Sequence, residues 1–362
     1  MSGDGPAGRC RAIGLMSGTS LDGIDAALIE TDGEQVFATG PSLTIPYSKS
    51  LRERLRAILG RRDPVPDIER ALTEQHATAV EALLRDASLK PADIRVVGFH
   101  GHTLLHRPQE RYTRQIGDGA LLARLTGIDV VNDFRTADVA AGGEGAPLVP
   151  AYHQALARTL EQPLAVLNIG GIANVTYVGA GQLIAFDTGP GNALLDQWTE
   201  KTTGNPYDAG GALAALGTPN KPVLDRLMQN PFFRRKPPKS LDRLDFDLVP
   251  LDGLSPSDGA ATLAAFTCRA VGRARDHLPE APRRWLVTGG GRHNDALMQM
   301  LAQLVAAPVA AVESVGWDGD ALEAQAFGFL AVRSLRGLPL SYPTTTGVPR
   351  AMTGGTHHAR SN

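Results

Sequence analysis

Residues 18–25 form a short polar turn between two apolar runs, and the turn combines glycines with hydroxyl and carboxylate side chains. Gly18 and Gly23 permit close backbone approach of a ligand, and the exposed backbone N–H groups of such a turn can bind an anion. Thr19 and Ser20 add hydroxyl donors. The combination suits a phosphate group, although the same residue types also dominate ordinary hairpin turns.

This turn is not a P-loop, because the pattern GxxxxGK[ST] is absent from the chain and no lysine lies nearby. The charge of a phosphate bound there needs another counterion. Asp22 and Asp25 supply hard carboxylate oxygens, the ligand type that Mg²⁺ prefers. We therefore expect a magnesium ion at the turn, with Asp22 as its ligand, bound directly or through water.

Two more glycine-rich turns follow other expected strands. NIGGIAN, residues 168–174, lies in a hairpin of the second half, and TGGGRHN, residues 288–294, opens a helix behind a buried strand. Consecutive glycines in front of a helix N-terminus are suited to a nucleotide. The dinucleotide pattern GxGxxG is absent, which argues against a dinucleotide.

Two expected strand ends carry polar side chains. Asp187, in FDTGPGN, suits a general base, a metal ligand or a turn cap. HGHTLLHR, residues 100–107, contains an HxH pair, but further metal ligands lack an obvious spacing. Sugar hydrogen bonding is therefore favoured there over a zinc or two-metal hydrolase site.

Apolar runs and helical patterns alternate along the whole chain, which predicts an α/β fold. In the first half, strands are expected at residues 11–16, 24–30, 36–45, 95–101 and 128–134, and helices at 49–59, 66–87 and 119–126. In the second half, strands are expected at 164–171, 172–178, 182–189, 285–291 and 308–314, and helices at 255–274, 294–305 and 320–336. Residues 230–246 are rich in proline and charge, and we expect an exposed, solvated insertion there.

The similar order of elements in the two halves predicts a duplicated fold, with two domains flanking a cleft in which ligands bind. The expected boundaries are 1–140 for domain I and 141–336 for domain II. The C-terminal segment, residues 337–362, is a candidate for completing domain I.

Composition limits the function. With 362 residues, of which 43% are hydrophobic and 20% charged, the chain can bury a large core. A net charge of -2 offers no general attraction for nucleic acid. Cys10 and Cys268 are too few for a disulfide framework, and no secretory h-region or membrane-spanning apolar run is found. These features predict a cytoplasmic protein.

The sequence resembles the anhydro-N-acetylmuramic acid kinase family over nearly its whole length. The matching stretches, in the family's order, are GLMSGTSLDGID, GFHGHTLLHRP, NDFRTADVAAGGEGAPLVP, LNIGGIANVT, FDTGPGN, NPYDAGG, TGGGRHN and DALEAQAFGFLA. The resemblance implies the duplicated actin-like, sugar kinase and heat-shock ATPase fold, with ATP and Mg²⁺ bound between two domains. It also implies a homodimer and a role in peptidoglycan recycling.

The family's reaction opens the 1,6 ether bridge of 1,6-anhydro-N-acetylmuramic acid with water, while O6 takes the γ-phosphoryl group of ATP. Asp187 matches the family's general base. The resemblance implies ATP contacts for Gly18, Thr19, Ser20, Leu21, Asp22, Gly23, Ile24, Asp25, Gly170, Gly171, Gly289, Gly290, Gly291 and Asn294. The residues implied on the sugar side are His100, Thr103, Asp133 and Arg135. The segment PPKSLDRLDF departs from the family's PPKSTGRE type, which leaves the role of that loop open.

Two other functions fit the same fold: an ordinary hexose or amino-sugar kinase, and an ATP-binding chaperone or filament-like protein. An ordinary kinase also needs an aspartate near its acceptor hydroxyl, so Asp187 does not separate it from the anhydro-sugar enzyme. Incorporation of solvent oxygen at C1 of the product does. A chaperone needs a long peptide-binding region, and none is evident in the sequence.

Overall fold

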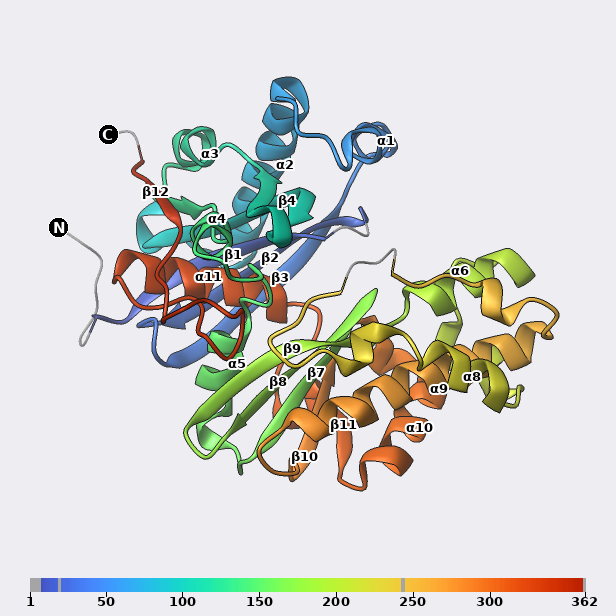
Figure 1. The fold of residues 1–362 in the computed structure, drawn as a ribbon. Helices are drawn as coiled ribbons and strands as arrows, with labels where there is room; N and C mark the ends of the chain where they lie inside the picture. Colours follow the sequence, from blue (N-terminus) through green and yellow to red (C-terminus); the bar gives the residue numbers. More distant parts are fainter. Residues whose placement is uncertain (1–7, 19–20, 242–244, 361–362) are drawn as a thin grey trace. The chain divides into compact units, whose positions relative to one another are not determined.

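The computed structural model describes residues 8–18, 21–241 and 245–360. The chain consists of two compact units (Figure 1). Unit 1 comprises Met1–Arg158 and Ala321–Asn362, and unit 2 comprises Thr159–Asp320. The described residues include no helix long and apolar enough to cross a membrane.

Unit 1 is built on a seven-stranded sheet in the order β12-β6-β4-β1-β2-β3, with β5 paired to β4. The strands β1, β2 and β3 form an antiparallel meander, while β4 runs parallel to both β1 and β6. The strand bounds are β1 Cys10–Ser17, β2 Gly23–Thr31, β3 Val36–Pro46, β4 Val96–Arg107, β5 Tyr112–Ile116, β6 Val130–Asn132 and β12 Thr356–His358.

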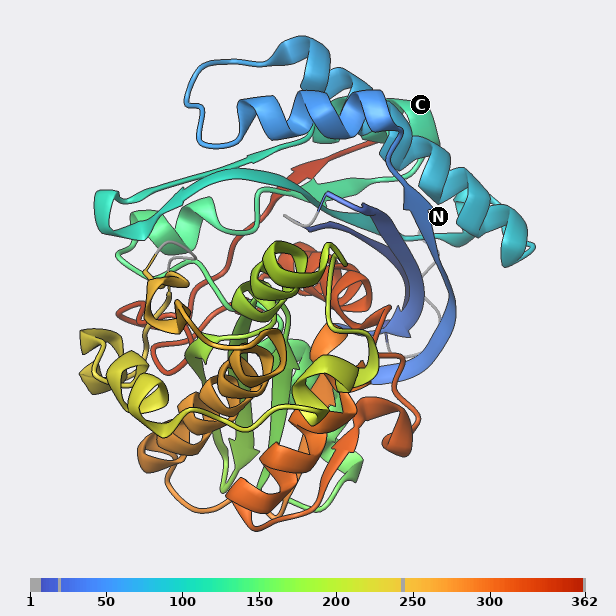
Figure 2. The same ribbon diagram turned by 90° about the vertical axis from the view of Figure 1, so that its right-hand side faces the viewer.

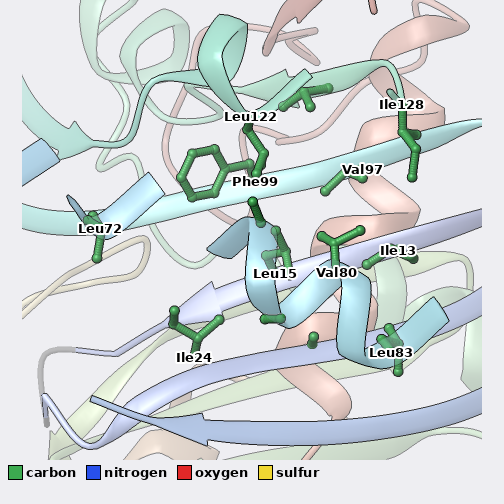
Figure 3. Close-up of a cluster of buried hydrophobic side chains, with 14 of the residues drawn as sticks. Ile13, Leu15, Ile24, Leu72, Val80, Leu83, Val97, Phe99, Leu122 and Ile128 are labelled. Atoms are coloured by element: carbon green, nitrogen blue, oxygen red, sulfur yellow. The ribbon is translucent and has the colours of Figure 1, made fainter. Parts of the chain in front are cut away.

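One face of this sheet carries the main hydrophobic core of unit 1. Helices α1 (Lys49–Ile58), α2 (Pro66–Asp86) and α3 (Gly119–Thr126) cover it. Alternate residues of the strands point into this core, which is the period-2 pattern of a half-buried strand. Figure 3 shows Ile13, Leu15, Val97 and Phe99 of β1 and β4 beside Leu72, Val80 and Leu83 of α2, all of them with no more than 1% exposed surface.

Helix α11, Leu322–Leu335, covers the opposite face of the same sheet (Figure 2). Gly14 of β1 and Gly98 of β4 are register partners, and both face this helix. A Cβ on Gly14 would lie 1.7 Å from the carbonyl oxygen of Ala324, and a Cβ on Gly98 would lie 2.0 Å from that of Phe327. The paired glycines therefore let α11 rest directly on the strand backbones.

The docking of α11 departs from the domain boundaries expected from the sequence. The expected domain II ends at residue 336 and includes this helix, whereas the helix packs on β1, β2 and β4 of unit 1. On the N-terminal side, the division falls after Arg158 rather than after residue 140. The boundary differs because Gly14 of β1 and Gly98 of β4 allow α11 to pack on unit 1. This contact joins residues more than 200 positions apart in the chain, so the local sequence does not reveal it.

Unit 2 contains a five-stranded sheet in the order β11-β10-β7-β8-β9. Its strands are β7 Leu164–Ile169, β8 Ile172–Gly179, β9 Gln182–Pro190, β10 Arg284–Thr288 and β11 Val309–Ala311. Its helices are α6 Ala193–Thr203, α7 Ala212–Ala215, α8 Lys221–Leu227, α9 Pro256–Ala274 and α10 Asp295–Val305. Helix α9 begins as expected, since the Ser255 hydroxyl accepts a hydrogen bond from the Asp258 backbone N–H at 3.1 Å.

The two sheets repeat one topology, which confirms the predicted duplication. In each, three antiparallel strands are followed by two parallel ones, and the order β6-β4-β1-β2-β3 of unit 1 corresponds to β11-β10-β7-β8-β9 of unit 2. The α/β class predicted from the sequence is therefore correct. The fold places the first hairpin turn of each unit at equivalent positions, between β1 and β2 and between β7 and β8.

Two local expectations were wrong. β4 does not end at the polar residues that begin with His100; it continues to Arg107 because the unexpected strand β5 pairs with it. Residues 230–246 were expected to be a solvated insertion, but among the described residues of this segment Phe232 and Phe233 are buried. Phe232 and Phe233 are 4% and 5% exposed, and they pack into the core of unit 2 with Phe266. The aromatic side chains outweigh the proline and charge content that suggested exposure.

Candidate active site residues

Asp187 lies near the end of β9, the strand at one edge of the unit 2 sheet. The register between β8 and β9 shifts immediately after it, because Asn174 pairs with Asp187 while Ala173 pairs with Gly189. Thr188 is the additional residue of this bulge, and bulges of this kind re-aim neighbouring side chains. The direction of the half-buried Asp187 carboxylate is therefore determined by this bulge and not by the regular pleat of the strand.

The segment that was expected to be solvated contacts Asp187 directly. The Asp187 backbone N–H donates to the carbonyl oxygen of Lys239 at 3.0 Å, and the Leu241 N–H donates to Asp187 Oδ2 at 2.8 Å. An edge strand leaves backbone groups unpaired, and here the loop pairs one of them. These two hydrogen bonds fix both the main chain and the carboxylate of Asp187.

The glycine-rich turns of unit 2 contact one another. The Asn192 N–H donates to the Gly170 carbonyl oxygen at 2.7 Å, which ties the turn after β9 to the turn after β7. Gly289 has φ of +75°, and its Cβ would lie 2.3 Å from Asn168 Oδ1, so only glycine fits there. At Gly171 a Cβ would meet only an ordinary contact at 3.6 Å, which leaves space over that turn for a ligand.

The remaining glycines of the second turn and Asn294 follow the same arrangement. Gly291 is crowded, since its Cβ would lie 2.5 Å from Ile169 Cγ2, whereas the nearest atom to a Cβ on Gly290 is 3.4 Å away. Asn294 Oδ1 accepts the Leu297 N–H at 2.9 Å and thereby caps α10. The buried Asn294 side chain therefore has a structural task at this helix N-terminus, whatever it contributes to a nucleotide.

In unit 1, the turn after β1 is described only in part, because Thr19 and Ser20 lie outside the described residues. Leu21 has φ of +60°, and its N–H donates to the Gly18 carbonyl oxygen at 3.2 Å. The Gly23 N–H donates to Asp22 Oδ1 at 3.0 Å, and Thr44 Oγ1 donates to Asp25 Oδ1 at 2.6 Å. Ile24 is fully buried and anchors β2 in the core.

Tyr47 links the two ends of that turn. Its hydroxyl lies 2.5 Å from Ser17 Oγ at the end of β1, and its backbone N–H donates to the Asp22 carbonyl oxygen at 3.1 Å. Ser17 Oγ also lies 2.9 Å from His102 Nδ1. The buried hydrogen bonds that link Tyr47, Ser17 and His102 support the end of β1 from which the turn starts. They were not expected from the sequence.

His100 and Arg135, both candidates for the sugar side, bind each other. Arg135 Nε and Nη2 lie 3.1 Å and 3.0 Å from His100 Nε2, and Arg135 Nη1 donates to the Gly145 carbonyl oxygen at 2.7 Å. Burial, and then the charge of Arg135, lower the pKa of His100 well below its ordinary value. His100 is therefore neutral and accepts from the guanidinium, which orients Arg135.

The two histidines of the HxH pattern have different partners, His100 binding Arg135 and His102 binding Ser17. Gly101 between them has φ of +74°, which breaks the regular alternation of the strand. Among the described residues, no group of three or more His, Cys, Asp or Glu side chains could hold a metal.

Thr103 and Asp133 are hydrogen-bonded within unit 1. Thr103 Oγ1 accepts from Gln115 Nε2 at 3.3 Å, on the β4–β5 hairpin. Asp133 has φ of +53°, and its Oδ1 accepts from Thr136 Oγ1 at 2.5 Å, which orders the start of α4, Thr136–Ala140. Thr103 lies within β4 and Asp133 directly follows β6, and neither contact identifies a sugar.

Glu323 is a further carboxylate that the sequence analysis did not single out, although it lies within the matched stretch DALEAQAFGFLA. It occupies the first turn of α11 and keeps solvent-accessible surface. Surrounding protein raises its pKa by desolvation, the charge of Arg135 lowers it, and that of Asp25 raises it again. Unit 1 thus brings Asp25, Arg135 and Glu323 into one electrostatic group, which only the docking of α11 reveals.

The residues of the turn fit a magnesium ion that the protein coordinates only in part. Asp22 and Asp25 provide hard oxygen donors, but the described residues contain no cage of three or more acidic or histidine ligands. Mg²⁺ is commonly held in this way, by one or two carboxylates together with phosphate oxygens and water. The donor set therefore suits a metal that arrives with a nucleotide.

A family model described as anhydro-N-acetylmuramic acid kinase matches residues 10–359. The anhydro-N-acetylmuramic acid kinase of Rhodospirillum rubrum is 58% identical over 353 residues, covering 96% of this chain and 93% of that protein. The protein of the same name from Paramagnetospirillum magneticum is 56% identical, covering 96% of this chain and 99% of its own. A ROK family glucokinase structure from Streptomyces griseus aligns with a TM-score of 0.42 at 14% identity, covering 89% of this chain and 99% of that one.

Proposed function

The chain belongs to the anhydro-N-acetylmuramic acid kinase family, and from that premise we propose that it phosphorylates 1,6-anhydro-N-acetylmuramic acid with ATP. In the proposed reaction water opens the 1,6 ether bridge, and the products are N-acetylmuramic acid 6-phosphate and ADP. The observation that carries the proposal is Asp187, a half-buried carboxylate fixed by the Leu241 N–H and by a strand bulge at the position that matches the family's general base.

Asp187 accepts the proton of the attacking water in this scheme. The water oxygen forms a bond to C1 as the bond from C1 to O6 breaks. O6 then takes the γ-phosphoryl group, and the bond from that phosphorus to the β-phosphate oxygen breaks to release ADP. One carboxylate is sufficient because the departing O6 needs no base of its own before it attacks phosphorus.

The turn after β1 is proposed to bind the phosphates of ATP. Gly18 and Gly23 flank backbone N–H groups, and Asp22 is the proposed magnesium ligand, with Asp25 near it. When bound, Mg²⁺ neutralises charge that develops on the phosphate oxygens. Tyr47 holds the two flanks of the turn together through its contacts with Ser17 and Asp22.

His100 and Arg135 are proposed to lie on the sugar side, together with Thr103 and Asp133. Arg135 is oriented by the neutral His100 imidazole and by the Gly145 carbonyl oxygen, which leaves a planar cation in a fixed position. Such a cation suits a carboxylate-bearing sugar. A homodimer in the cytoplasm, working in peptidoglycan recycling, is the remaining part of the proposal, and it rests on the resemblance to the family.

The test of the proposed function uses ¹⁸O-labelled water. Purified protein is incubated with ATP, Mg²⁺ and the anhydro sugar, and the phosphorylated product is analysed by mass spectrometry. We expect one ¹⁸O atom on C1 and none in the phosphate ester, because water attacks carbon while O6 attacks phosphorus. Glucose and N-acetylglucosamine serve as comparison substrates. Phosphorylation of these ordinary sugars without incorporation at C1 would identify an ordinary sugar kinase instead.

Replacement of Asp22 by alanine tests the magnesium assignment. If Asp22 holds the metal that accompanies ATP, the Asp22→Ala variant should lose at least about tenfold in kcat/KM for ATP, and should need more Mg²⁺ for half-maximal rate. Steady-state kinetics over a Mg²⁺ series measures both quantities. Asp32→Ala, in the exposed turn after β2, is the matched control and should retain wild-type kinetics. An unchanged Mg²⁺ requirement in Asp22→Ala would remove this assignment.

A further inference from the structure

Lys239 is a buried lysine, 4% exposed, in the loop that contacts Asp187. Its Nζ donates to the Phe232 carbonyl oxygen at 3.3 Å and lies 4.4 Å from the centroid of the Phe232 ring. The Phe186 ring, on the residue directly before Asp187, has its centroid 5.9 Å from the same nitrogen. The ammonium group therefore lies between the loop on one side and strand β9 on the other.

This ammonium group has no carboxylate within ion-pair distance among the residues that the structure describes. Burial of an ammonium without an ion pair costs several kcal/mol, and an apolar side chain of similar length fills the same space without that cost. The Asp187 carboxylate is the negative charge that stabilises the ammonium form. Because a buried ammonium is costly, its presence next to Asp187 indicates that Lys239 has a role that an apolar side chain of the same size could not fill.

The main chain of the same residue acts on Asp187 as well. The Lys239 carbonyl oxygen accepts the Asp187 N–H at 3.0 Å, and Leu241, two residues further on, donates its N–H to Asp187 Oδ2 at 2.8 Å. Movement of residues 239–241 would loosen both contacts together. The bond from Lys239 Nζ to Phe232, whose ring is itself buried, holds this short segment in place.

We propose that Lys239 is a positioning residue for Asp187, holding residues 239–241 against the edge of β9 and supporting the negative charge of the carboxylate. The inference rests on the proposed role of Asp187 as the general base. It assigns a task to the PPKSLDRLDF loop, whose role the sequence left open. Lys239 acts through Asp187 and takes no part in the bonds that form and break.

The charged groups around Lys239 make its contribution dependent on pH. Burial, with Arg235, lowers the pKa of Lys239 to about 8; Asp187 opposes that shift, and Arg273 adds to it. His277 also senses the charge of Lys239. Below about pH 8 the ammonium is charged and supports Asp187, and above it the charge is lost. The turnover of the wild-type protein should therefore decline as the pH rises through about 8.

Three variants test the proposal: Lys239→Met, Lys239→Arg and the control Lys236→Met, which removes an exposed lysine from the same loop. Lys239→Met should lower kcat about tenfold while the KM for ATP stays within about twofold, because only Asp187 is disturbed. Its pH profile should lack the decline near pH 8. Lys239→Arg keeps a cation that does not titrate, so it should restore most of kcat and also lack the decline. Lys236→Met should match the wild type.

A double substitution shows whether Lys239 works through Asp187. In the Asp187→Asn background, Lys239→Met should cost no further activity, because the group that it positions has already lost its function. A further tenfold loss in that background, or wild-type kcat in Lys239→Met, would overturn the proposal. If Lys239→Met fails to fold, the wild-type profile decides: constant kcat from about pH 7 to 9.5 would overturn it too. Absence of wild-type activity on the anhydro sugar would instead refute the proposed function.

Discussion

Asp187→Asn should lower kcat by a factor of about 10² to 10⁴, the usual contribution of a general base, while binding of ATP with Mg²⁺ stays close to wild type. Asparagine has the shape of aspartate and keeps a carbonyl oxygen that can accept the Leu241 N–H, so the clamp from the loop survives. What is lost is the acceptor for the proton of water. Single-turnover kinetics measures the chemical step, and calorimetry measures nucleotide binding.

The control for Asp187→Asn is Asp225→Asn, which removes a partly exposed carboxylate of unit 2 that pairs with Arg269. Removal of a surface ion pair costs about 1 kcal/mol of stability or less, and kcat should not change. Residual turnover in Asp187→Asn should still place ¹⁸O on C1, since the route is the same and only its rate falls. Turnover in Asp187→Asn equal to the wild type would show that another group takes the proton.

The element pattern of the chain was predictable because it depends on local sequence. Helix α2 was expected at residues 66–87 and runs over Pro66–Asp86; α3 matches Gly119–Thr126. The hairpin after β1 and its repeat after β7 follow from apolar runs separated by glycine-rich turns. The duplicated sheet then follows from the repeated order of elements.

The remaining features depend on contacts between distant residues, which periodicity does not record. Gly14 and Gly98 look like two isolated strand glycines, and only the docking of α11 on both explains them. Lys239 lies in a stretch whose composition predicts a solvated loop, yet its backbone completes the edge of β9 some 50 residues earlier. Glu323 joins Arg135 through the same long-range docking of α11. The side chains that surround the candidate site were therefore the least predictable part.

His76 shows where a local pattern and a buried contact combine. The spacing of Ile68, Leu72, His76, Ala79 and Leu83 predicts one face of α2; the last four are fully buried, and Ile68 is half-buried. His76 Nδ1 lies 2.8 Å from the Leu72 carbonyl oxygen, and the centroid of its ring lies 4.7 Å from that of the Phe99 ring, with the two planes tilted by 53°. Because a histidine ring can bind a proton, its burial in the hydrophobic core makes the stability of unit 1 depend on pH. The spacing pattern alone does not predict this dependence.

Acid should destabilise unit 1 well before most carboxylates are protonated. Burial lowers the pKa of both His76 and His102 to about 4, from an ordinary value of 6.5. Between these values the unfolded chain binds protons that the folded chain does not, so stability falls as the pH falls. From pH 7 to pH 5 the free energy of unfolding should drop by about 2 kcal/mol for each histidine, or about 4 kcal/mol for the pair.

Urea unfolding of the whole chain at pH 7, 6 and 5, followed by circular dichroism and by tryptophan fluorescence, measures this loss. His76→Gln removes one titrating ring, so the difference between pH 7 and pH 5 should shrink by about 2 kcal/mol, whatever the substitution costs at neutral pH. His293→Gln, at an exposed position, is the control and should leave the difference unchanged. Comparison of pH differences rather than absolute stabilities cancels the contribution of carboxylates, which titrate in all three proteins. An undiminished pH dependence in His76→Gln would mean that His76 is protonated in the folded core, and its contact with Leu72 would then be that of a charged donor.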